Sequence, residues 1–364
     1  MKLILDDGAV MHGRAFGTAR PVAGEVVFNT AMAGYVETLT DPSYRGQILV
    51  LTYPLIGNYG VPAPRPTGSL DSPYESSRIQ VQAVVVQNYV DQFSHRNAVR
   101  SLGQWLRSDD VPAITGIDTR MLTRRLREHG TMKGWLVPAD MSLDEAKRVA
   151  ASVEMQRDVF HLVAPESPVR YGGTGPTIML VDAGAKDNMV RSLLARGAGV
   201  LRVPWHARLA DYIEEVDGIV IGNGPGDPAD LGELVGQVRS LLQRFEGPIF
   251  GICLGNQILA LAAGGSTYKL PYGHRGVNQP VHDLVTRRCY VTSQNHGYAV
   301  DDDSLPEGWE PWFVNINDGT NEGIRSRTRP FFGVQFHPEA RPGPEDTRFL
   351  FDDFLRLARP GMRG

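Results

Sequence analysis

Hydrophobic and polar residues are patterned differently in the two halves of the chain, and the change predicts two domains. The first half carries short runs rich in β-branched residues, such as GEVVFNT (24–30), QILVLTYP (47–54) and RIQVQAVVVQNY (78–89). Such runs predict β-strands. The second half alternates apolar strand-like runs with helix-like segments, which is typical of parallel strands with helices on both faces. The predicted fold class is α/β: an N-terminal mixed α/β domain rich in β-strands, followed by a doubly wound, mostly parallel sheet.

Local signals add detail to the first domain. A hairpin is predicted over LILDDGAVMHG (3–13), where the Asp-Gly pair supplies the turn. Helices are predicted over 94–109 and 118–130 because their apolar residues recur at helical spacing. Ser94 and Asp118 are the expected N-caps, and a glycine ends the second helix.

Stretches rich in Pro, Ser and Gly suggest where the domains divide. The run APESPVRYGGTGPT (164–177) is typical of a linker. We therefore expect a first domain at 1–160, a linker at 161–176 and a second domain at 177–364. A run with four prolines at 61–77 predicts a surface excursion of the first domain.

The second domain should place its functional residues at one edge of its sheet. Strand-like runs begin at positions 177, 199, 218 and 248, and helices are expected through Arg191 and Leu194, near Tyr212, and through Val238 and Leu242. In an open parallel sheet, ligands bind beyond the carboxyl ends of the strands. The residues that directly follow the strand-like runs are thus the candidates for function.

The run PIFGICLGNQ (248–257) joins a strand to a helix through a turn that holds Cys253 between Gly251 and Gly255. This is the cysteine version of the G-x-S-x-G elbow, whose tight turn leaves no room for a Cβ on either side of the nucleophile. The helix N-terminus favours a thiolate, and backbone N–H groups there can receive an oxyanion. A lone cysteine is more often a core residue, and Cys289 is assigned that role. The paired glycines favour the catalytic interpretation of Cys253.

A second apolar run, FFGVQF (331–336), ends at His337 and Glu339, with Pro338 between them. Proline biases the residue before it toward an extended conformation, so the side chains at 337 and 339 should project to the same side. His337 can then take the thiol proton, while Glu339 orients the imidazole. A lone His-Pro-Glu at a loop start is more often a turn or capping feature. The prediction therefore depends on the elbow.

The glycine-rich run GNGPGDP (222–228) follows another predicted strand. It lacks the Lys and Ser/Thr of a P-loop and the G-x-G-x-x-G spacing, so nucleotide binding is not favoured. Exposed backbone at Gly224 and Gly226 suits a small polar ligand, with Asp227 capping the next helix. A plain cap and turn is the alternative.

Composition narrows the class of protein. The chain has 37 basic and 41 acidic residues and a net charge of −4, which argues against nucleic acid or an anionic membrane as the main partner. Acidic residues at positions 6 and 7 come too soon for a signal peptide. Two cysteines cannot form a disulfide framework. We therefore expect a cytoplasmic protein. No metal site is expected, because His274 and His282 have no Cys or carboxylate at ligand spacing.

Taken together, GNGPGDP, GICLGNQ, TSQNHGYAV and FHPEA resemble the motifs of class I glutamine amidotransferases of the triad type. The resemblance covers nearly all of 177–360. It implies that Cys253, His337 and Glu339 hydrolyse the side-chain amide of glutamine through a thioester. Asn256 departs from the family pattern, since many members have His there, but this position is outside the triad.

Two segments of the first domain, 25–60 and 116–130, closely resemble the small-subunit family of carbamoyl-phosphate synthetase. This implies that the first domain binds a large synthetase subunit that uses ammonia, bicarbonate and ATP to make carbamoyl phosphate for arginine and pyrimidine biosynthesis. ATP and Mg²⁺ are expected on that large subunit, and no cofactor on this chain.

The same resemblance implies which residues hold glutamine. They are Ser43, Gly224, Gly226, Leu254, Gln257, Asn295, Gly297 and Tyr298. Backbone N–H groups of Gly224 and Leu254 would form the oxyanion hole, and His296 is interpreted as structural. Two alternatives stay open. The chain could be the glutaminase component of another synthetase, such as anthranilate synthase, against which only the first domain argues. It could also be a catalytically silent scaffold, against which the intact triad argues.

Overall fold

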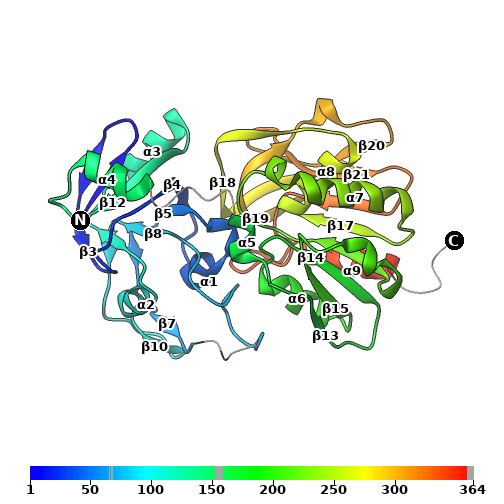
Figure 1. The fold of residues 1–364 in the computed structure, drawn as a ribbon, viewed down its shortest axis with the longest axis horizontal. Helices are drawn as coiled ribbons and strands as arrows, with labels where there is room; N and C mark the ends of the chain where they lie inside the picture. The colour runs from blue at the N-terminus through cyan, green and yellow to red at the C-terminus, as the bar shows by residue number, and fades with distance from the viewer. Residues whose placement is uncertain (65, 67–68, 152–158, 359–364) are drawn as a thin grey trace. The chain divides into compact units, whose positions relative to one another are not determined.

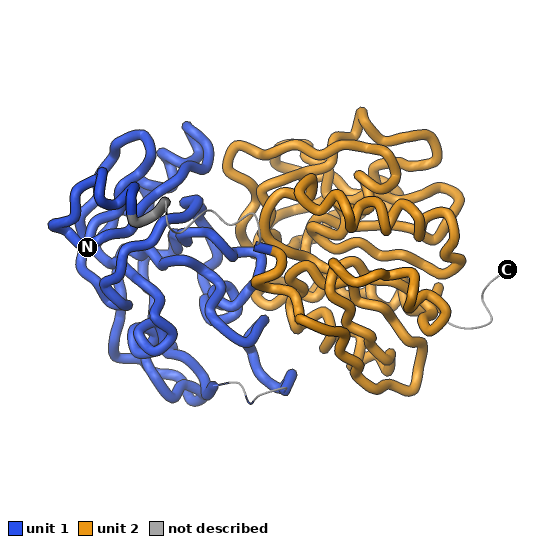
Figure 2. The backbone as a smooth tube through the Cα atoms, viewed as in Figure 1, with its two compact units in different colours: residues 1–159 blue, residues 160–364 orange. Residues whose placement is uncertain are grey.

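The computed structural model describes residues 1–64, 66, 69–151 and 159–358. The chain divides into two compact units, residues 1–159 and 160–364 (Figure 2). The segment 161–176, which we expected to be a linker, contains most of helix α5 (Val159–Val163) and all of strand β13 (Val169–Tyr171). Because β13 pairs with β15 (Gly199–Pro204), this segment contributes a strand to the sheet of the second unit.

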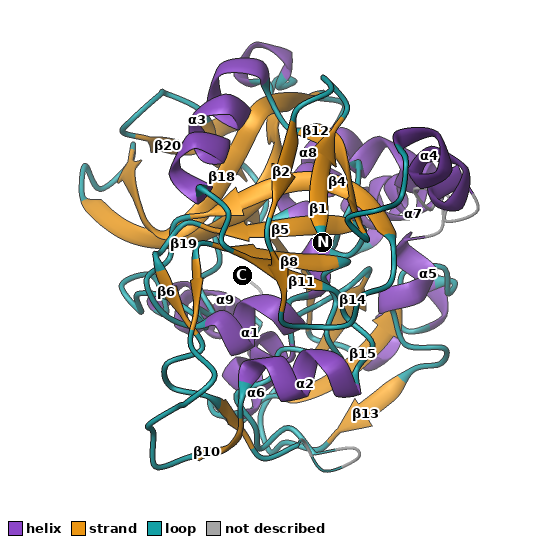
Figure 3. Cartoon of the chain, turned by 90° about the vertical axis from the view of Figure 1, so that its left-hand side faces the viewer, coloured by secondary structure: helices purple, strands orange, loops and turns teal. Residues whose placement is uncertain are grey.

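The first unit is built on an eight-stranded mixed sheet (Figures 1 and 3). In spatial order its strands are β2 (Val10–His12), β1 (Lys2–Leu5), β12 (Met132–Val137), β4 (Val22–Asn29), β5 (Gln47–Leu51), β8 (Ala83–Val86), β11 (Ala113–Thr115) and β3 (Arg14–Ala15). The other elements are α1 (Tyr35–Thr40), the 3-10 turn η1 (Pro42–Tyr44), α2 (Leu102–Ser108), α3 (Thr119–His129), α4 (Leu143–Ala151), and the short pairs β6 (Leu55–Ile56) with β9 (Asn88–Tyr89) and β7 (Val61–Pro62) with β10 (Ala98–Arg100). The predicted hairpin is confirmed, since β1 and β2 are antiparallel and Gly8 takes a φ of 86° in the turn.

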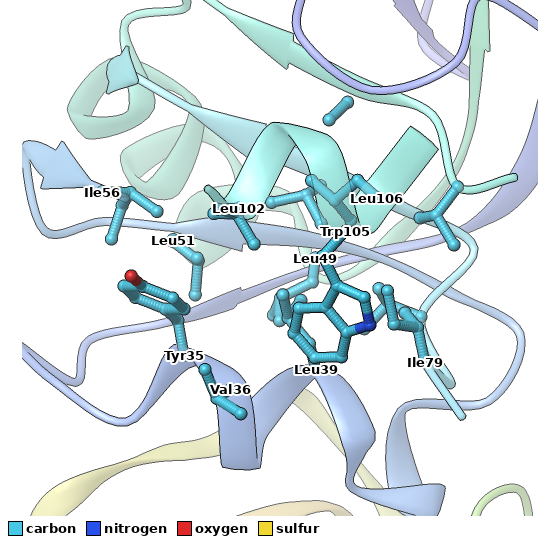
Figure 4. Close-up of a cluster of buried hydrophobic side chains, with 14 of the residues drawn as sticks. Tyr35, Val36, Leu39, Leu49, Leu51, Ile56, Ile79, Leu102, Trp105 and Leu106 are labelled. Carbon is cyan, nitrogen blue, oxygen red and sulfur yellow. The ribbon is translucent and has the colours of Figure 1, made fainter. Parts of the chain in front are cut away.

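Side chains from α1, β5 and α2 meet in the main hydrophobic core of the first unit (Figure 4). Tyr74 belongs to this core, with its ring 5.5 Å from that of Trp105 and its hydroxyl donating to Pro62 O at 3.0 Å. The prediction that 61–77 is a surface excursion is therefore wrong for Val61 and Tyr74, both of which are buried. Their apolar surface outweighs the loop-like composition around them. Three residues of this segment, 65, 67 and 68, lie outside the described residues.

The two predicted helices of this unit have different outcomes. Helix α3 is confirmed, and the Asp118 side chain caps its N-terminus as expected. Helix α2 starts later than predicted, because Ser101 is its N-cap and not Ser94. Ser101 and Gln104 form a capping box in which each side chain accepts the other residue's backbone N–H. The residues before Ser101 are then available to form β10.

The second unit has a ten-stranded sheet (Figure 1). In spatial order its strands are β13, β15, β14 (Thr177–Asp182), β16 (Gly218–Ile221), β17 (Ile249–Ile252), β22 (Phe331–Val334), β21 (Asn321–Ser326), β20 (Trp309–Asn315), β18 (Thr267–Asp283) and β19 (Cys289–Val300). The run from β15 to β22 is parallel, which confirms the predicted parallel core. The strands beyond β22 are antiparallel and were not predicted.

Helices cover both faces of this parallel core, as predicted. They are α6 (Asp187–Leu194), α7 (Gly232–Arg244), α8 (Leu254–Ala263) and α9 (Phe349–Leu357). On β17, the Phe250 ring lies 5.8 Å from that of Phe354 on α9. The next residue, Gly251, faces the backbone of Gly255 on α8. Successive residues of a strand point to opposite faces, so α9 and α8 lie on opposite faces of β17.

The helix expected near Tyr212 is absent from the described residues. Two 3-10 turns, η2 (Leu209–Asp211) and η3 (Ile213–Glu215), occupy this position. The segment buries Leu209, but η3 has no buried residue, so it lacks the continuous apolar stripe of a longer helix. A further turn, η4 (Pro228–Leu231), leads into α7, and η5 (Asp302–Ser304) follows β19. Among the described residues, no helix is both long and apolar enough to cross a membrane.

Candidate active site

Three neighbouring parallel strands end at one edge of the second sheet. Strand β17 lies between β16 and β22 and pairs with both in parallel. The segments that follow these strands carry Gly224, Cys253 and His337 respectively. The predicted candidates therefore lie at the carboxyl ends of adjacent strands.

Cys253 occupies a strained turn between β17 and α8. Its φ of 55° and ψ of −106° lie in a region that residues with a Cβ rarely adopt. A Cβ added to Gly251 would lie 2.4 Å from Gly255 O, and one added to Gly255 would lie 2.0 Å from Ile221 O. Only glycine fits at either position. The close contacts thus explain why the elbow motif has glycine on both sides of the nucleophile.

His337 and Glu339 form a buried pair, with His337 Nδ1 and Glu339 Oε1 2.7 Å apart. Among the described residues, His337 Nε2 has no hydrogen-bond partner of normal geometry. Burial lowers the pKa of His337, but the negative charges of Glu339 and then of Cys253 outweigh this effect, so the pKa is raised. The arrangement therefore favours the protonated form of His337.

A buried lysine, missed by the sequence analysis, lies behind the carboxylate. Lys186 Nζ is 3.2 Å from Glu339 Oε1 and donates to Ala340 O at 2.6 Å. Burial raises the pKa of Glu339, but the charge of Lys186 and then that of His337 outweigh it, so the pKa falls to about 2. The available signal was its position, because Lys186 closely follows the carboxyl end of β14.

A second residue missed from the sequence contacts the sulfur. Gln335, which is fully buried, donates from Nε2 to Cys253 Sγ at 3.7 Å. The thiol in turn donates to the backbone oxygen of Asn295, also at 3.7 Å. Residues 335 and 336 form a bend, and residues 337–340 form a turn in which the Ala340 N–H donates to His337 O at 3.0 Å. The extended conformation expected at 337–339 is therefore wrong, and it is the turn that brings His337 and Glu339 together.

Comparisons with known proteins extend over both units. A family model described as "Carbamoyl-phosphate synthase small chain, CPSase domain" matches residues 3–136, and one described as "Glutamine amidotransferase class-I" matches residues 179–357. The chain is 49% identical over 361 residues to "Carbamoyl phosphate synthase small chain" of Symbiobacterium thermophilum, covering 97% of each chain. The chain belongs to the carbamoyl-phosphate synthase small-chain family.

Relatives in eukaryotes include single chains and fusions. The chain is 46% identical over 355 residues to "Carbamoyl phosphate synthase arginine-specific small chain" of Aspergillus fumigatus, covering 96% of this chain and 78% of the relative. It is 42% identical over 371 residues to "Multifunctional protein pyr1-3" of Dictyostelium discoideum, covering 97% of this chain and 17% of that protein. The family thus includes both separate small chains and segments of larger proteins.

Most of the expected glutamine contacts of this small chain gather around the elbow. A Cβ on Gly224 would lie 2.7 Å from the Leu254 side chain, so these two residues adjoin. Gln257 on α8 donates to Tyr298 O on β19 at 2.8 Å. Asn295 and Gly297 lie on the same strand, and Gly226 takes a φ of 80° in the turn after β16.

Ser43 belongs to the first unit, unlike the other expected contacts. It lies in η1, is buried, and its backbone N–H donates to Asp41 Oδ1 at 2.9 Å. Its role in holding glutamine stays a prediction from the resemblance.

The position that departs from the family pattern, Asn256, is fully buried on α8. A Cβ on Gly333 would lie 2.5 Å from Asn256 Oδ1, so glycine on β22 makes room for this side chain. Asn256 therefore packs against Gly333 on β22, and its backbone N–H donates to Cys253 O at 3.1 Å.

Three residues whose side chains are of types that can bind a metal lie close to β19, the strand that carries several of the expected glutamine contacts. The possible ligand atoms of His274, His296 and Glu322 all lie within 4.8 Å of one another. His274 Nε2 is 2.8 Å from Asp318 Oδ2, and its Nδ1 is 3.2 Å from Glu322 Oε1. Burial lowers the pKa of His274, but the hydrogen bond and charge of Glu322, then those of Asp318, raise it overall. Both ring nitrogens of His274 are therefore engaged by carboxylates.

No Cys or carboxylate lies at ligand spacing from His274 along the sequence, and the contacts of its ring come from distant positions. The fold brings Asp318 and Glu322 to it from more than 40 positions away along the chain. The structural interpretation of His296 stays a prediction. Its Nδ1 lies 2.8 Å from Tyr298 O, and burial holds its pKa well below the usual range. It is neutral, and it supports the strand that carries the expected glutamine contacts.

Proposed function

We propose that this chain hydrolyses glutamine with Cys253, His337 and Glu339 and delivers the ammonia to a carbamoyl-phosphate synthase large chain. The observation that carries the proposal is the strained elbow of Cys253 at one strand end, beside a buried His337–Glu339 pair at the end of the next strand. A thiol nucleophile, a base and an orienting carboxylate are the groups that acyl transfer needs.

The first half of the cycle forms a thioester. The Cys253 thiolate attacks the side-chain amide carbon of glutamine, and the carbonyl oxygen becomes an oxyanion. When the C–N bond breaks, the imidazolium of His337 gives its proton to the departing nitrogen, which leaves as ammonia. Glu339 holds the ring through Nδ1, so the proton is presented on Nε2.

The second half restores the enzyme. Neutral His337 takes a proton from water, and the resulting hydroxide attacks the thioester carbon. The C–S bond breaks, its electron pair returns to the sulfur of Cys253, and glutamic acid is released and ionises. The imidazolium and thiolate are then ready for the next glutamine.

Backbone amides at the elbow suit the oxyanion. Leu254 is the first residue of α8, and the first N–H groups of a helix have no intrahelical acceptor. Gly224 adjoins Leu254 and can offer a second N–H from the loop after β16. Ser43, Gly226, Gln257, Asn295, Gly297 and Tyr298 are proposed to complete the glutamine site.

A partner chain is part of the proposal. The first unit matches the family model of the small-chain CPSase domain, and the relatives named above are small chains of a synthase. Carbamoyl phosphate synthesis from bicarbonate needs ATP and Mg²⁺, which we place on the large chain. The match of the first unit to the small-chain family favours carbamoyl phosphate as the product over that of another synthetase, such as anthranilate. We also propose a cytoplasmic location, because both cysteines are free thiols.

Co-expression with the large chain of the same organism tests the proposal. The purified complex should make carbamoyl phosphate from glutamine, bicarbonate and ATP, with one glutamate released for each carbamoyl group. A complex that releases no glutamate from glutamine, or a chain that co-purifies only with an anthranilate synthase component, would contradict it.

A further inference from the structure

The sulfur of Cys253 takes part in hydrogen bonds to Asn295 and from Gln335 that have opposite effects on its charge. The thiol donates to Asn295 O at 3.7 Å, and this bond favours the neutral thiol because a thiolate has no proton to donate. The Gln335 amide donates from Nε2 to the same sulfur at 3.7 Å, and such a donor favours the thiolate. On the basis of the glutaminase function proposed above, we propose that Gln335 is a further catalytic residue, whose side-chain N–H stabilises the negative charge on Cys253.

The neighbouring glutamine fixes which end of the Gln335 amide meets the sulfur. Gln257 Nε2 donates to Gln335 Oε1 at 3.1 Å and to Tyr298 O at 2.8 Å. Because Gln335 Oε1 is the acceptor of this bond, the NH₂ end of the same amide is turned to the sulfur. Gln257 is thus a positioning residue, connected both to the strand of expected glutamine contacts and to the donor on the nucleophile.

The surroundings of Gln335 make the contact rigid and dry. Gln335 directly follows β22, its backbone N–H donates to Glu322 O at 2.8 Å, and its side chain is fully buried. A hydrogen bond to a charged group is stronger than a neutral one, and it gains strength where water is excluded. The amide carries no charge of its own, so it can stabilise the thiolate at every pH at which the enzyme works.

The donor acts twice in the cycle. It favours the thiolate before attack on glutamine, and it receives the charge again when the thioester C–S bond breaks and the electron pair returns to sulfur. The substitution of Gln335 alone removes none of the charged groups of the site, which are His337, whose pKa responds to the charge of Cys253, and Glu339 and Lys186 behind it. A change in the behaviour of Cys253 can then be assigned to the lost amide.

Gln335→Leu tests the proposal, because leucine keeps much of the side-chain volume and removes the N–H. The probe is alkylation of the full chain by iodoacetamide as a function of pH, followed for the peptide that contains Cys253 so that the exposed Cys289 does not interfere. We expect the midpoint of the rate against pH to rise by about one unit and the rate at pH 7 to fall about tenfold, as for loss of one hydrogen bond to a charged group.

A matched control separates this effect from general loss of stability. Gln237 on α7 also makes two side-chain hydrogen bonds, accepting from Leu209 N at 2.8 Å and donating to Ala207 O at 3.1 Å. Gln237→Leu should lower the melting temperature and leave the alkylation midpoint of Cys253 at the parental value. Gln257→Leu leaves Gln335 in place but releases its amide, and a smaller upward shift is expected.

The outcomes are distinct. A parental midpoint in folded Gln335→Leu would overturn the proposal, and if that variant does not fold, a parental midpoint in Gln257→Leu would do so. An upward shift in Gln335→Leu, or in Gln257→Leu if Gln335→Leu does not fold, supports it when Gln237→Leu shows none. Alkylation requires no glutamine, so a parent chain that alkylates normally but does not hydrolyse glutamine would show failure of the proposed function alone.

Discussion

Lys186 Nζ lies 3.2 Å from Glu339 Oε1, and neither side chain is more than 3% exposed. The lysine also donates to Ala340 O at 2.6 Å, so the backbone just after the triad carboxylate is tied to the same ammonium group. Glu339 itself contacts His337 through the same Oε1 atom. The triad carboxylate therefore has a second buried partner, the ammonium group of Lys186. The positive charge of Lys186 favours the ionised form of Glu339.

Replacing Lys186 should change the pH dependence of the enzyme. The pKa of Glu339 is lowered chiefly by Lys186, against the effect of burial, so in Lys186→Met this pKa should rise. As the pH is lowered, Glu339 should then become protonated, and activity should be lost, at a less acidic pH than in the parent. The acid limb of the kcat/KM profile for glutamine should therefore move to higher pH. We expect activity at pH 7 to fall about tenfold or more, as is usual for loss of an orienting group.

The same substitution should reduce stability. A carboxylate with a depressed folded pKa contributes stability above its unfolded pKa of about 4.3, and this contribution is lost as pH falls through the folded value. Removing one partner of a buried ion pair is expected to lower the free energy of unfolding by about 3–5 kcal/mol. Lys269→Met, at an exposed lysine of the same unit, is the control. Equal acid limbs and melting temperatures for both variants would contradict this account of Lys186.

The base and its orienter should differ in their effects. His337→Asn removes the group that transfers protons, and we expect glutamine hydrolysis to fall by about 10⁴-fold or more. Glu339→Gln keeps a side chain that can contact the ring and should lose less activity than His337→Asn, because removing the orienting carboxylate costs less than removing the base. Steady-state measurement of glutamate release by the intact complex compares them. The roles are wrongly assigned if Glu339→Gln is the more damaged of the two.

The elbow should tolerate no side chain at Gly255. A Cβ there would lie 2.0 Å from Ile221 O, so Gly255→Ala must move the backbone of α8 or β16. We expect a loss of at least about 2 kcal/mol in the free energy of unfolding, in the range of overpacked sites. Gly236→Ala is the matched control, since that helical glycine has nothing within 4 Å of its added Cβ, and a gain of about 0.5–1 kcal/mol is expected. Thermal or chemical unfolding measures both, and similar shifts in the two variants would exclude the close contact.

The parts of the site that were predictable from sequence are those that local geometry dictates. The G-x-C-x-G turn at Cys253 admits no Cβ at either glycine. His337 and Glu339 are two positions apart and do pair, although a turn and not the expected extended run brings their side chains together. The parallel strands also followed from alternating patterns. Lys186 and Gln335 were missed because each is defined by a contact across the fold, and neither a buried lysine nor a buried glutamine has a local sequence signal.

Errors in the fold have a similar origin. The N-terminus of α2 was misplaced because Ser94 and Ser101 are both acceptable caps, and only Ser101 has Gln104 in the position that completes a capping box. Tyr74 was assigned to a surface loop because its neighbours are polar, whereas its ring packs on Trp105. The carboxylates around His274 come from a distant antiparallel strand and loop that no spacing rule connects to it.

The most direct test of the central claim compares two nitrogen sources in a single variant. The complex of Cys253→Ser with the large chain should make almost no carbamoyl phosphate from glutamine, because the nucleophile that forms the thioester is lost. It should still make carbamoyl phosphate from free ammonia at the rate of the parent complex. Glutamine-dependent synthesis at the parental rate by Cys253→Ser would contradict the account.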